Sequence, residues 1–343
     1  MSVTEKLLFV ETFLLGDLLY LGALISAVRA QRPDAQIEVL ASTATREFPF
    51  FERLNVTVHH FDFPWNHIGW HLHPFRLAQA LAAFKRQFGR QFQDYTVFDP
   101  RGDLRQALTA RLLQPRRFSQ YHSGAKWRDA WRGVLPRHAF ISRHEFLRQI
   151  AVECGLLPES VLPWPWLADF RSDGIGKTSR SVLLAPEASN QLRYWKPANW
   201  KLLSRRLKQA GYDVTLIIHR GDAVPAAEPG DFNNIWHGSV LDLARLIGKA
   251  RAVIAVDSFI GHLAAAVGTP VVSLFGPQLP ERWRPWGEKT TVVLADNYPC
   301  RPCAQKKCIY HFCNCMNAIN IDQVSHAFYG LIDQYNCRGE ECL

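Results

Sequence analysis

The sequence lacks a long hydrophobic run. Among its 343 residues, the nearest candidate for a membrane-spanning helix, Leu7 to Val28, is interrupted by Glu11 and Asp17, and such charges are costly in hydrocarbon. The N-terminus also lacks a basic region followed by a short apolar core and a small-residue cleavage site, so a cleaved secretion signal is not indicated. We therefore expect a cytoplasmic protein without a transmembrane segment.

The composition also lacks the bias that is typical of disordered or collagenous chains, because 48% of the residues are hydrophobic and 21% are charged. Lys and Arg outnumber Asp and Glu by 40 to 31, which gives a net charge of +9. This charge favours phosphate groups, nucleic acid or an anionic membrane surface as partners. No helix-turn-helix, zinc-finger or RNA-binding signature accompanies it, so we do not expect a nucleic-acid partner.

Cysteine is crowded into one stretch rather than spread out as a disulfide framework. Five of the eight cysteines lie close together, at Cys300, Cys303, Cys308, Cys313 and Cys315. In a reducing compartment this crowding favours either a structural metal site or buried thiols. Because the spacing lacks the paired C-x2-C units of many zinc sites, we expect reduced thiols, with a structural metal on Cys300 to Cys315 as the alternative.

The length predicts two domains, each large enough to bury its own core. In the first half, the expected strands are Leu7–Val10, Ile37–Ala41, Val56–Phe61 and Tyr95–Phe98, and the expected helices are Asp17–Arg29, Thr45–Leu54 and Arg76–Gln93. Strands separated by helical crossovers predict a parallel sheet that is covered on both faces. Residues 114–148 are rich in Arg, Trp and His and show no clear period.

A stretch rich in turn-forming residues, between Leu157 and Arg180, separates this pattern from a second one. There the expected strands are 181–185, 214–218, 252–256 and 271–275, and the expected helices are 197–210, 241–249 and a helix from Ile260. We therefore predict an α/β fold of two doubly wound, Rossmann-like domains. They are expected over residues 1–165 and 178–325, with a C-terminal helix and tail over residues 326–343.

Open parallel sheets bind ligands at the carboxyl ends of their strands. Two such sheets facing each other across a cleft take one ligand from each side, which is the arrangement called GT-B. A periplasmic receptor is disfavoured by the missing signal peptide. A dinucleotide-dependent enzyme is disfavoured because no Gly-x-Gly-x-x-Gly turn follows a strand.

The turn after the first expected strand contains Gly16 and Asp17. Glycine permits a tight turn, and an acidic residue is favoured in the first turn of a helix. Asp17 is therefore either a helix cap or a general base that removes a proton from a hydroxyl group.

The turn after strand 181–185 contains Ser189 and Arg193 and leads into the helix that Pro197 opens. Hydroxyl, backbone amide and guanidinium groups can together hold phosphate oxygens, and a capped loop with a solvated arginine is the alternative.

The strand 252–256 ends in Asp257 and Ser258, and the helix that follows contains Gly261 and His262. A helix N-terminus at the carboxyl end of a buried strand predicts an anion site suited to a diphosphate. Core packing explains the alanines of this helix, but it does not explain two ionisable groups at the end of a strand.

Together these motifs resemble glycosyltransferase family 9, the lipopolysaccharide heptosyltransferases. The similar elements are Gly16-Asp17, the element from Asp99 to Arg105, Asp257-Ser258-x-x-x-His262, Phe275-Gly276-Pro277, Cys300-Arg301-Pro302-Cys303 and Cys315-Met316. The resemblance covers nearly the whole chain. It departs from the family pattern at Phe259, where glycine is usual.

The resemblance implies roles for individual residues. It implies Asp17 as the catalytic base, and Arg101 and Arg105 as residues that bind the phosphates or carboxylates of the acceptor. The implied donor nucleotide-sugar site consists of Ser189, Arg193, Asp257, Ser258, Gly261 and His262. Arg193 stands at the position of a family lysine that binds nucleotide phosphates.

The resemblance also implies an inverting transfer of heptose from ADP-heptose to an inner-core lipopolysaccharide acceptor, Kdo-lipid A or a heptosyl acceptor, without a metal or other cofactor. The acceptor is anionic and embedded in the inner membrane, so the net charge of +9 suits a protein at the inner face of that membrane. Trp127 and Trp131, in the basic region from Arg76 to Arg148, are candidates for an acceptor or membrane face, or for core packing. The alternatives are another nucleotide-sugar donor, a protein acceptor, or a sugar-nucleotide-binding protein without catalysis.

Overall fold

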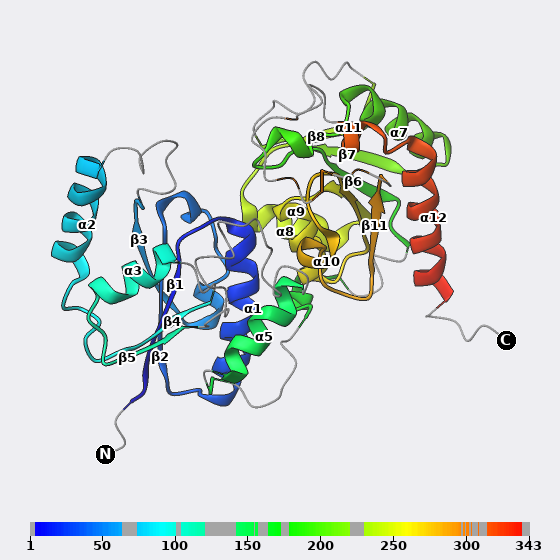
Figure 1. Cartoon of the computed structure of the whole chain (residues 1–343). Helices are drawn as coiled ribbons and strands as arrows, with labels where there is room; N and C mark the ends of the chain where they lie inside the picture. Colours follow the sequence, from blue (N-terminus) through cyan, green and yellow to red (C-terminus); the bar gives the residue numbers. More distant parts are fainter. Residues whose placement is uncertain are drawn as a thin grey trace. The chain divides into compact units, whose positions relative to one another are not determined.

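Two compact units, Met1–Pro163 and Trp164–Leu343, each contain one sheet (Figure 1). The computed structural model describes residues 4–63, 74–100, 104–120, 142–153, 155–156, 164–172, 178–219, 230–295, 298, 300–301, 303, 308 and 314–337. No helix in these ranges has the length and apolar character that crossing a membrane requires.

The first unit contains a five-stranded parallel sheet in the order β3-β2-β1-β4-β5. Its strands are β1 (Lys6–Glu11), β2 (Gln36–Ser42), β3 (Thr57–Phe61), β4 (Thr96–Asp99) and β5 (Arg117–Gln120). The chain passes from β1 outward to β3 and then returns to β4 on the other side of β1. The strand order therefore reverses between β1 and β4, and ligands of doubly wound sheets bind at the carboxyl ends of strands at such a reversal.

Helices in the described part of the first unit are α1 (Leu15–Gln31), α2 (Pro74–Phe88), α3 (Leu104–Leu112) and α5 (Arg143–Glu153). Phe84 and Phe88 of α2 join a buried cluster with Leu8 and Val10 of β1. Strand β1 is buried along nearly its whole length, as expected where helices cover both faces of a parallel sheet.

The prediction of a helix from Thr45 to Leu54 is wrong. The structure has two single 3₁₀ turns there, Thr43–Thr45 and Glu52–Leu54. Pro49 lies between them, and a proline inside a helix removes a hydrogen bond and clashes with the preceding turn.

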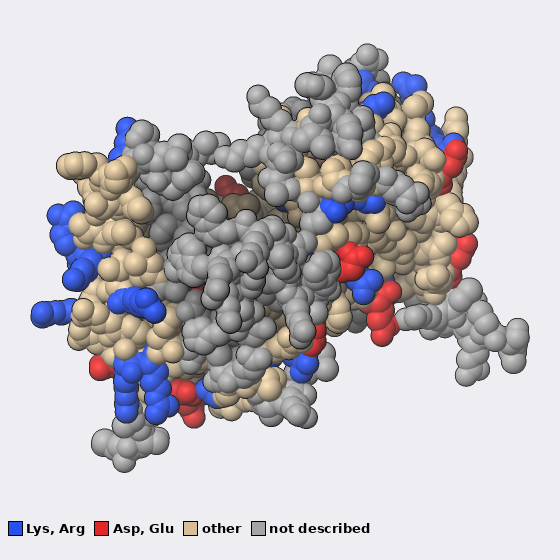
Figure 2. Space-filling view, in the orientation of Figure 1, with Lys and Arg blue, Asp and Glu red and all other residues tan. Residues whose placement is uncertain are grey.

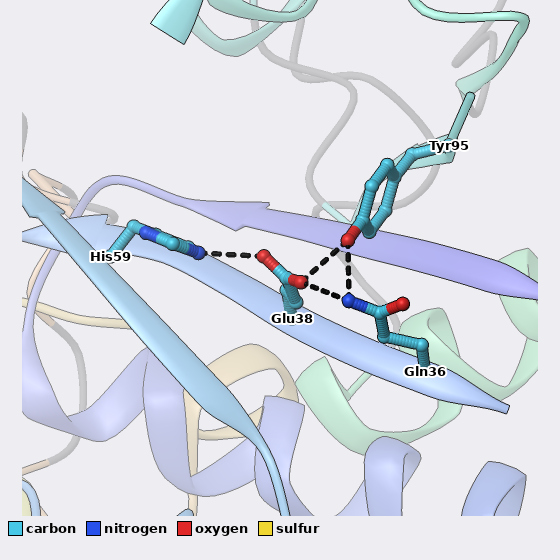
Figure 3. A network of polar contacts seen from close by, with 4 residues as sticks. All are labelled: Gln36, Glu38, His59 and Tyr95. Carbon is cyan, nitrogen blue, oxygen red and sulfur yellow. Dashed lines mark hydrogen bonds and ion pairs between the residues drawn. The ribbon is translucent and has the colours of Figure 1, made fainter. Parts of the chain in front are cut away.

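A polar network surrounds the buried Glu38 of β2 (Figure 3). Glu38 is 6% exposed, and its Oε2 lies 2.6 Å from His59 Nε2. Its Oε1 accepts hydrogen bonds from Tyr95 Oη at 2.5 Å and from Gln36 Nε2 at 2.7 Å. Burial alone would raise the pKa of Glu38, but the hydrogen bonds with Tyr95, His59 and Gln36 outweigh it and lower that pKa. The network therefore holds a carboxylate in the core.

The second unit contains a six-stranded parallel sheet in the order β11-β10-β9-β6-β7-β8. Its strands are β6 (Ser181–Ala185), β7 (Asp213–Ile217), β8 (Asn234–Trp236), β9 (Ala252–Val256), β10 (Val271–Phe275) and β11 (Thr290–Leu294). Strands β6 to β8 extend to one side, and β9 to β11 extend to the other. The strand order reverses between β6 and β9, so the turns after these two strands occupy the expected ligand position.

Helices in the described part of the second unit are α7 (Pro197–Gln209), α8 (Val240–Lys249), α9 (Phe259–Val267), α10 (Pro280–Trp283), α11 (Asn314–Asn317) and α12 (Ile321–Cys337). Trp195 and Trp200 are fully buried and pack edge to face at 5.1 Å between ring centroids. Trp195 Nε1 also donates a hydrogen bond to the carbonyl oxygen of Ile319 at 2.8 Å. These contacts fix the segment that follows Arg193.

Candidate functional site

Asp17 lies in the first turn of α1, directly after the carboxyl end of β1. Leu14 is the N-cap of this helix, so the interpretation of Asp17 as a helix cap is wrong. Asp17 is the third residue of the helix, where the helix dipole favours a negative charge. Its side chain is 15% exposed, so part of this side chain is open to solvent.

An arginine that the sequence analysis did not single out lies beside Asp17. Arg143 begins α5 and has a side chain that is only 2% exposed. Its Nε lies 3.6 Å from Asp17 Oδ1, and its Nη2 lies 3.4 Å from Oε2 of Glu11, the fully buried last residue of β1. Its Nη1 donates a hydrogen bond to the carbonyl oxygen of Pro100, directly after β4, at 3.1 Å. Arg143 therefore connects the two strand ends at which the order of the first sheet reverses.

A signal for this helix was present in the sequence. Ser142 and Glu145 have the spacing of a capping box, and the amide of Glu145 donates to Ser142 Oγ at 3.1 Å. The box predicts where α5 begins. It does not predict that Arg143 reaches β1, because that contact depends on how α5 packs.

The structure describes the two predicted acceptor residues only in part. Arg101 lies outside the described residues. Arg105 lies in α3, the helix that follows β4, and its side chain also lies outside the described part. Arg105 therefore lies on the helix after β4, and Asp17 lies on the helix after β1. The strand order reverses between these two strands. The role of Arg105 stays a prediction.

In the second unit, Arg193 and Asp257 come together from the turns after β6 and β9. The side chain of Asn190 accepts a hydrogen bond from the amide of Leu192 at 2.9 Å and so caps the 3₁₀ turn that carries Arg193. Arg193 Nη1 donates to the backbone carbonyl oxygen of Asp257 at 3.1 Å and lies 3.4 Å from Asp257 Oδ2. Burial raises the pKa of Asp257 to about 6, although the neighbouring Arg193 lowers it in part.

Ser258 is the N-cap of α9 but makes no side-chain capping bond. Its Oγ and the Nε of Arg193 are buried and have no hydrogen-bond partner in the described part of the chain. A serine N-cap normally satisfies a helix amide. Here the hydroxyl, the first amides of α9 and the guanidinium edge are all left for another group, which suits an anion.

The remaining predicted donor residues differ in their surroundings. His262 is 6% exposed in the second turn of α9, whereas Ser189 is exposed after β6. At Gly261, an added Cβ would lie 3.3 Å from Pro285 Cγ and 3.6 Å from Ser273 Oγ. Gly261 therefore allows α9 to pack closely on the sheet. Phe259 is the first residue of α9 and is partly buried.

A further buried carboxylate organises this end of the sheet. Glu187 lies two residues after the end of β6 and is 7% exposed. It accepts a hydrogen bond from the backbone amide of His219 at 2.7 Å. It thereby ties the turn after β6 to the segment after β7. The sequence signal that could have identified Glu187 is an acidic residue just beyond a buried strand.

The described residues of the cysteine-rich segment include contacts with the chain directly after β10. The amide of Cys303 donates to the carbonyl oxygen of Pro277 at 2.8 Å, and a Cβ added to Gly276 would lie 2.5 Å from Met316 Sδ. No disulfide joins Cys300, Cys303, Cys308 or Cys315 to another cysteine of the described ranges, and Cys313 lies outside the described residues. Within the described ranges no three His, Cys, Asp or Glu residues are grouped as a metal site would require.

Comparison with known proteins identifies a family that part of this chain matches. Residues 167–313 match the profile of glycosyltransferase family 9 (heptosyltransferase). Lipopolysaccharide heptosyltransferase 1 of Pseudomonas aeruginosa is 34% identical over 125 residues, which is 34% of this chain and 34% of that protein. The matched stretch thus spans about a third of the length of this curated relative.

Solved structures are similar over far more of the chain. The E. coli heptosyltransferase WaaC with ADP has a TM-score of 0.64 at 16% identity and covers 95% of this chain and 99% of that chain. The iron-containing dodecameric glycosyltransferase TibC from enterotoxigenic E. coli has a TM-score of 0.57 at 14% identity, over 98% of this chain and 78% of that chain. The predicted GT-B fold of two doubly wound domains is therefore confirmed. The family resemblance is confirmed for part of the chain, because residues 167–313 match the model of glycosyltransferase family 9.

Proposed function

We propose that the protein is an inverting glycosyltransferase that moves heptose from ADP-heptose to an inner-core lipopolysaccharide acceptor, either Kdo-lipid A or a heptosyl acceptor. The observation that carries this proposal is the family 9 match over residues 167–313, which include the Arg193–Asp257 pair and the start of α9. A curated relative is named a lipopolysaccharide heptosyltransferase, and a structural neighbour is a heptosyltransferase with ADP.

We propose that the donor diphosphate binds at the start of α9. The amides of the first turn, the hydroxyl of Ser258 and the guanidinium of Arg193 would hold its oxygens, while His262 and the exposed Ser189 contribute from the same strand ends. As ADP leaves, negative charge grows on the diphosphate. Fixed amides and a guanidinium stabilise such charge without a metal ion.

Asp17 is the proposed general base. The acceptor hydroxyl oxygen forms a bond to the anomeric carbon of the heptose as the bond from that carbon to ADP breaks. The hydroxyl proton passes to the Asp17 carboxylate, and the bonding electrons leave with ADP. Because attack occurs from the face opposite ADP, the anomeric centre is inverted and one carboxylate suffices. Arg101 and Arg105 would bind the anionic groups of the acceptor.

A panel of nucleotide sugars, with release of the nucleoside diphosphate as the readout, tests the donor. We expect release of ADP from ADP-heptose in the presence of Kdo-lipid A. Turnover with another nucleotide sugar, or with a protein as acceptor, would reassign the substrates within the same fold. Asp17→Asn tests the base, because loss of a general base lowers kcat by about 10²- to 10⁴-fold, whereas a sugar-nucleotide sensor shows no turnover to lose and binds ADP-heptose in both forms.

The proposed reaction uses no metal, and the clustered cysteines are proposed as reduced thiols. Elemental analysis of the purified protein tests this. Stoichiometric iron or zinc that is lost when Cys300 and Cys303 are replaced by serine would instead assign a structural metal to the Cys300 to Cys315 segment. The structural neighbour TibC is iron-containing.

We also propose that the protein acts in the cytoplasm and binds the inner face of the inner membrane through a basic surface on α2. Residues 74–93 contain no acidic residue, and Arg76, Lys85, Arg86 and Arg90 are all exposed there. Figure 2 shows blue side chains gathered over the region of α2. Phe75, at the start of the helix, is 92% exposed and suits insertion between lipid headgroups.

Vesicle co-sedimentation tests this surface. Each basic side chain near an anionic membrane contributes about 1 kcal/mol, so the K85E/R86E variant should lose most of its binding to phosphatidylglycerol vesicles. The R46E/R53E variant changes the charge equally, at two other exposed residues of the first unit, and should still bind. Equal loss in both variants would mean that net charge, and not this surface, accounts for binding.

A further inference from the structure

We propose that Arg143 is a positioning residue that holds the Asp17 carboxylate in its reactive orientation. This inference rests on the proposed function, because it acts through Asp17 as the base. It adds a residue from α5 to a mechanism that the sequence motifs had confined to the turns after β1 and β4.

The three nitrogens of the Arg143 guanidinium each face a different oxygen. Nη1 donates to the Pro100 carbonyl at 3.1 Å, Nη2 lies 3.4 Å from Glu11 Oε2, and Nε lies 3.6 Å from Asp17 Oδ1. A guanidinium is a rigid plane with donors in a fixed fork. Two partners at the ends of β1 and β4 therefore fix the plane, and the remaining edge is aimed at Asp17.

Burial separates the anchor from the base. Glu11 is fully buried and Arg143 is 2% exposed, whereas 15% of the Asp17 side chain is exposed. Oδ1, the oxygen nearest Arg143, is itself buried, so the exposed fraction of Asp17 belongs to its other atoms. The solvent-exposed part of the Asp17 side chain is therefore the part that an incoming hydroxyl group can reach.

The charges support the same division of roles. Glu11 and Asp17 are two acidic groups on one guanidinium, and two carboxylates close together in a buried site repel each other unless a cation lies between them. Arg143 provides that cation. Glu11 balances and anchors it, and because Glu11 is sealed from solvent it is an anchor and not the base.

The test measures kcat and KM with ADP-heptose and Kdo-lipid A. Arg143→Met should lower kcat about 10²-fold, the scale of a misoriented catalytic group, while KM for ADP-heptose changes less than about 2-fold, because the proposed donor site lies in the other unit. Arg143→Lys keeps the charge and should recover part of kcat. Arg148→Met is the matched control, since Arg148 lies on the same helix and pairs with Glu145 at 2.7 Å, and it should leave kcat unchanged.

A methionine at position 143 leaves Glu11 buried without its cation, which threatens folding. The double variant E11Q/R143M removes both charges and keeps the test valid if R143M does not fold. It should show the same loss of kcat, with ADP affinity intact.

The double variant D17N/R143M separates this inference from the assignment of the base. If Arg143 acts only through Asp17, D17N/R143M should be no slower than D17N alone. Losses that multiply, or an R143M kcat equal to that of R148M, would overturn the positioning role. If D17N itself keeps wild-type kcat, the proposed base is wrong, and that failure is visible without any Arg143 variant.

Discussion

At the scale of single residues, Asp257 should make nucleotide binding depend on pH. Its pKa is raised to about 6 by burial, so the carboxyl group is ionised at pH 7 and becomes protonated as the pH falls through that value. Protonation removes a negative charge beside the proposed diphosphate position and releases Arg193, so ADP affinity should rise on acidification. Calorimetric titration with ADP at several pH values measures this.

Asp257→Asn is the control for that experiment. ADP itself gains a proton in the same pH range, and this contribution is common to both proteins. Bound ADP would raise the pKa of Asp257 above its free value of about 6, so the wild-type affinity should rise relative to the variant as the pH falls toward about 6. Below that pH the two curves should be parallel. Curves that stay parallel throughout would remove Asp257 from the diphosphate site.

Glu38 should stabilise the first unit only where it is ionised. Its hydrogen bonds lower its folded-state pKa below the ordinary value of a glutamate, so its contribution is fully present above the unfolded pKa and is lost as the pH falls through the folded pKa. Glu38→Gln should lower the free energy of unfolding by about 1–3 kcal/mol at pH 7. Urea unfolding at pH 7 and at acid pH should show this difference shrinking with acidity.

Glu47→Gln is the matched variant, because Glu47 is an exposed carboxylate of the same unit. It should change the free energy of unfolding by less than about 0.5 kcal/mol. A Glu38→Gln variant that behaves like Glu47→Gln would mean that the network in Figure 3 adds no stability.

Residues differ in how far the sequence predicts their place. Asp257 and Arg193 were predicted because each follows a buried strand, and parallel strands bring such turns to one edge. Their contact at 3.4 Å agrees with that reasoning. Arg143 was not predicted, because its partners Glu11 and Asp17 lie more than 120 positions earlier in the chain and no local pattern encodes that approach.

At the scale of elements, Gly276 should be intolerant of a side chain. An added Cβ would lie 2.5 Å from Met316 Sδ and 3.1 Å from Cys315 Sγ, so Gly276→Ala should push the Cys315-Met316 turn away from the end of β10. The expected cost is about 1–3 kcal/mol in the free energy of unfolding, measured by thermal or urea unfolding of the full chain.

Gly330→Ala is the matched substitution in the same unit. Gly330 lies within α12, and a Cβ there would meet nothing within 4 Å. Alanine should therefore stabilise the helix by about 0.5–1 kcal/mol. If both variants change stability in the same direction, steric contact with Met316 does not determine the effect at Gly276.

Elements were predictable where their burial was uniform. Central strands such as β1 and β9 are continuous apolar runs, and the sequence predicted both. Strands β8 and β11 lie at the edges of their sheet and were missed, since β8 has only three residues and is largely exposed. The predicted helix over Thr45–Leu54 is absent, because Pro49 interrupts the segment.

At the scale of the whole molecule, two separate sheets predict two separate ligand-binding positions, one at each sheet. Each sheet has its own reversal of strand order, between β1 and β4 and between β6 and β9 (Figure 1). Two ligand positions follow from topology alone. Which ligand each one takes follows from the side chains: a carboxylate held by a buried arginine in the first unit, and a guanidinium with free helix amides in the second.

Hydrogen exchange with ADP should therefore protect the second unit at two segments, 186–195 and 257–262, which carry Arg193 and the first turn of α9. The first-turn amides have no partners within a helix, so they exchange quickly until phosphate oxygens accept from them. AMP, which lacks the second phosphate, should protect residues 257–262 less than ADP does. Protection that appears instead at residues 11–17, with none at 257–262, would place the nucleotide on the first sheet and exchange the proposed roles of the two units.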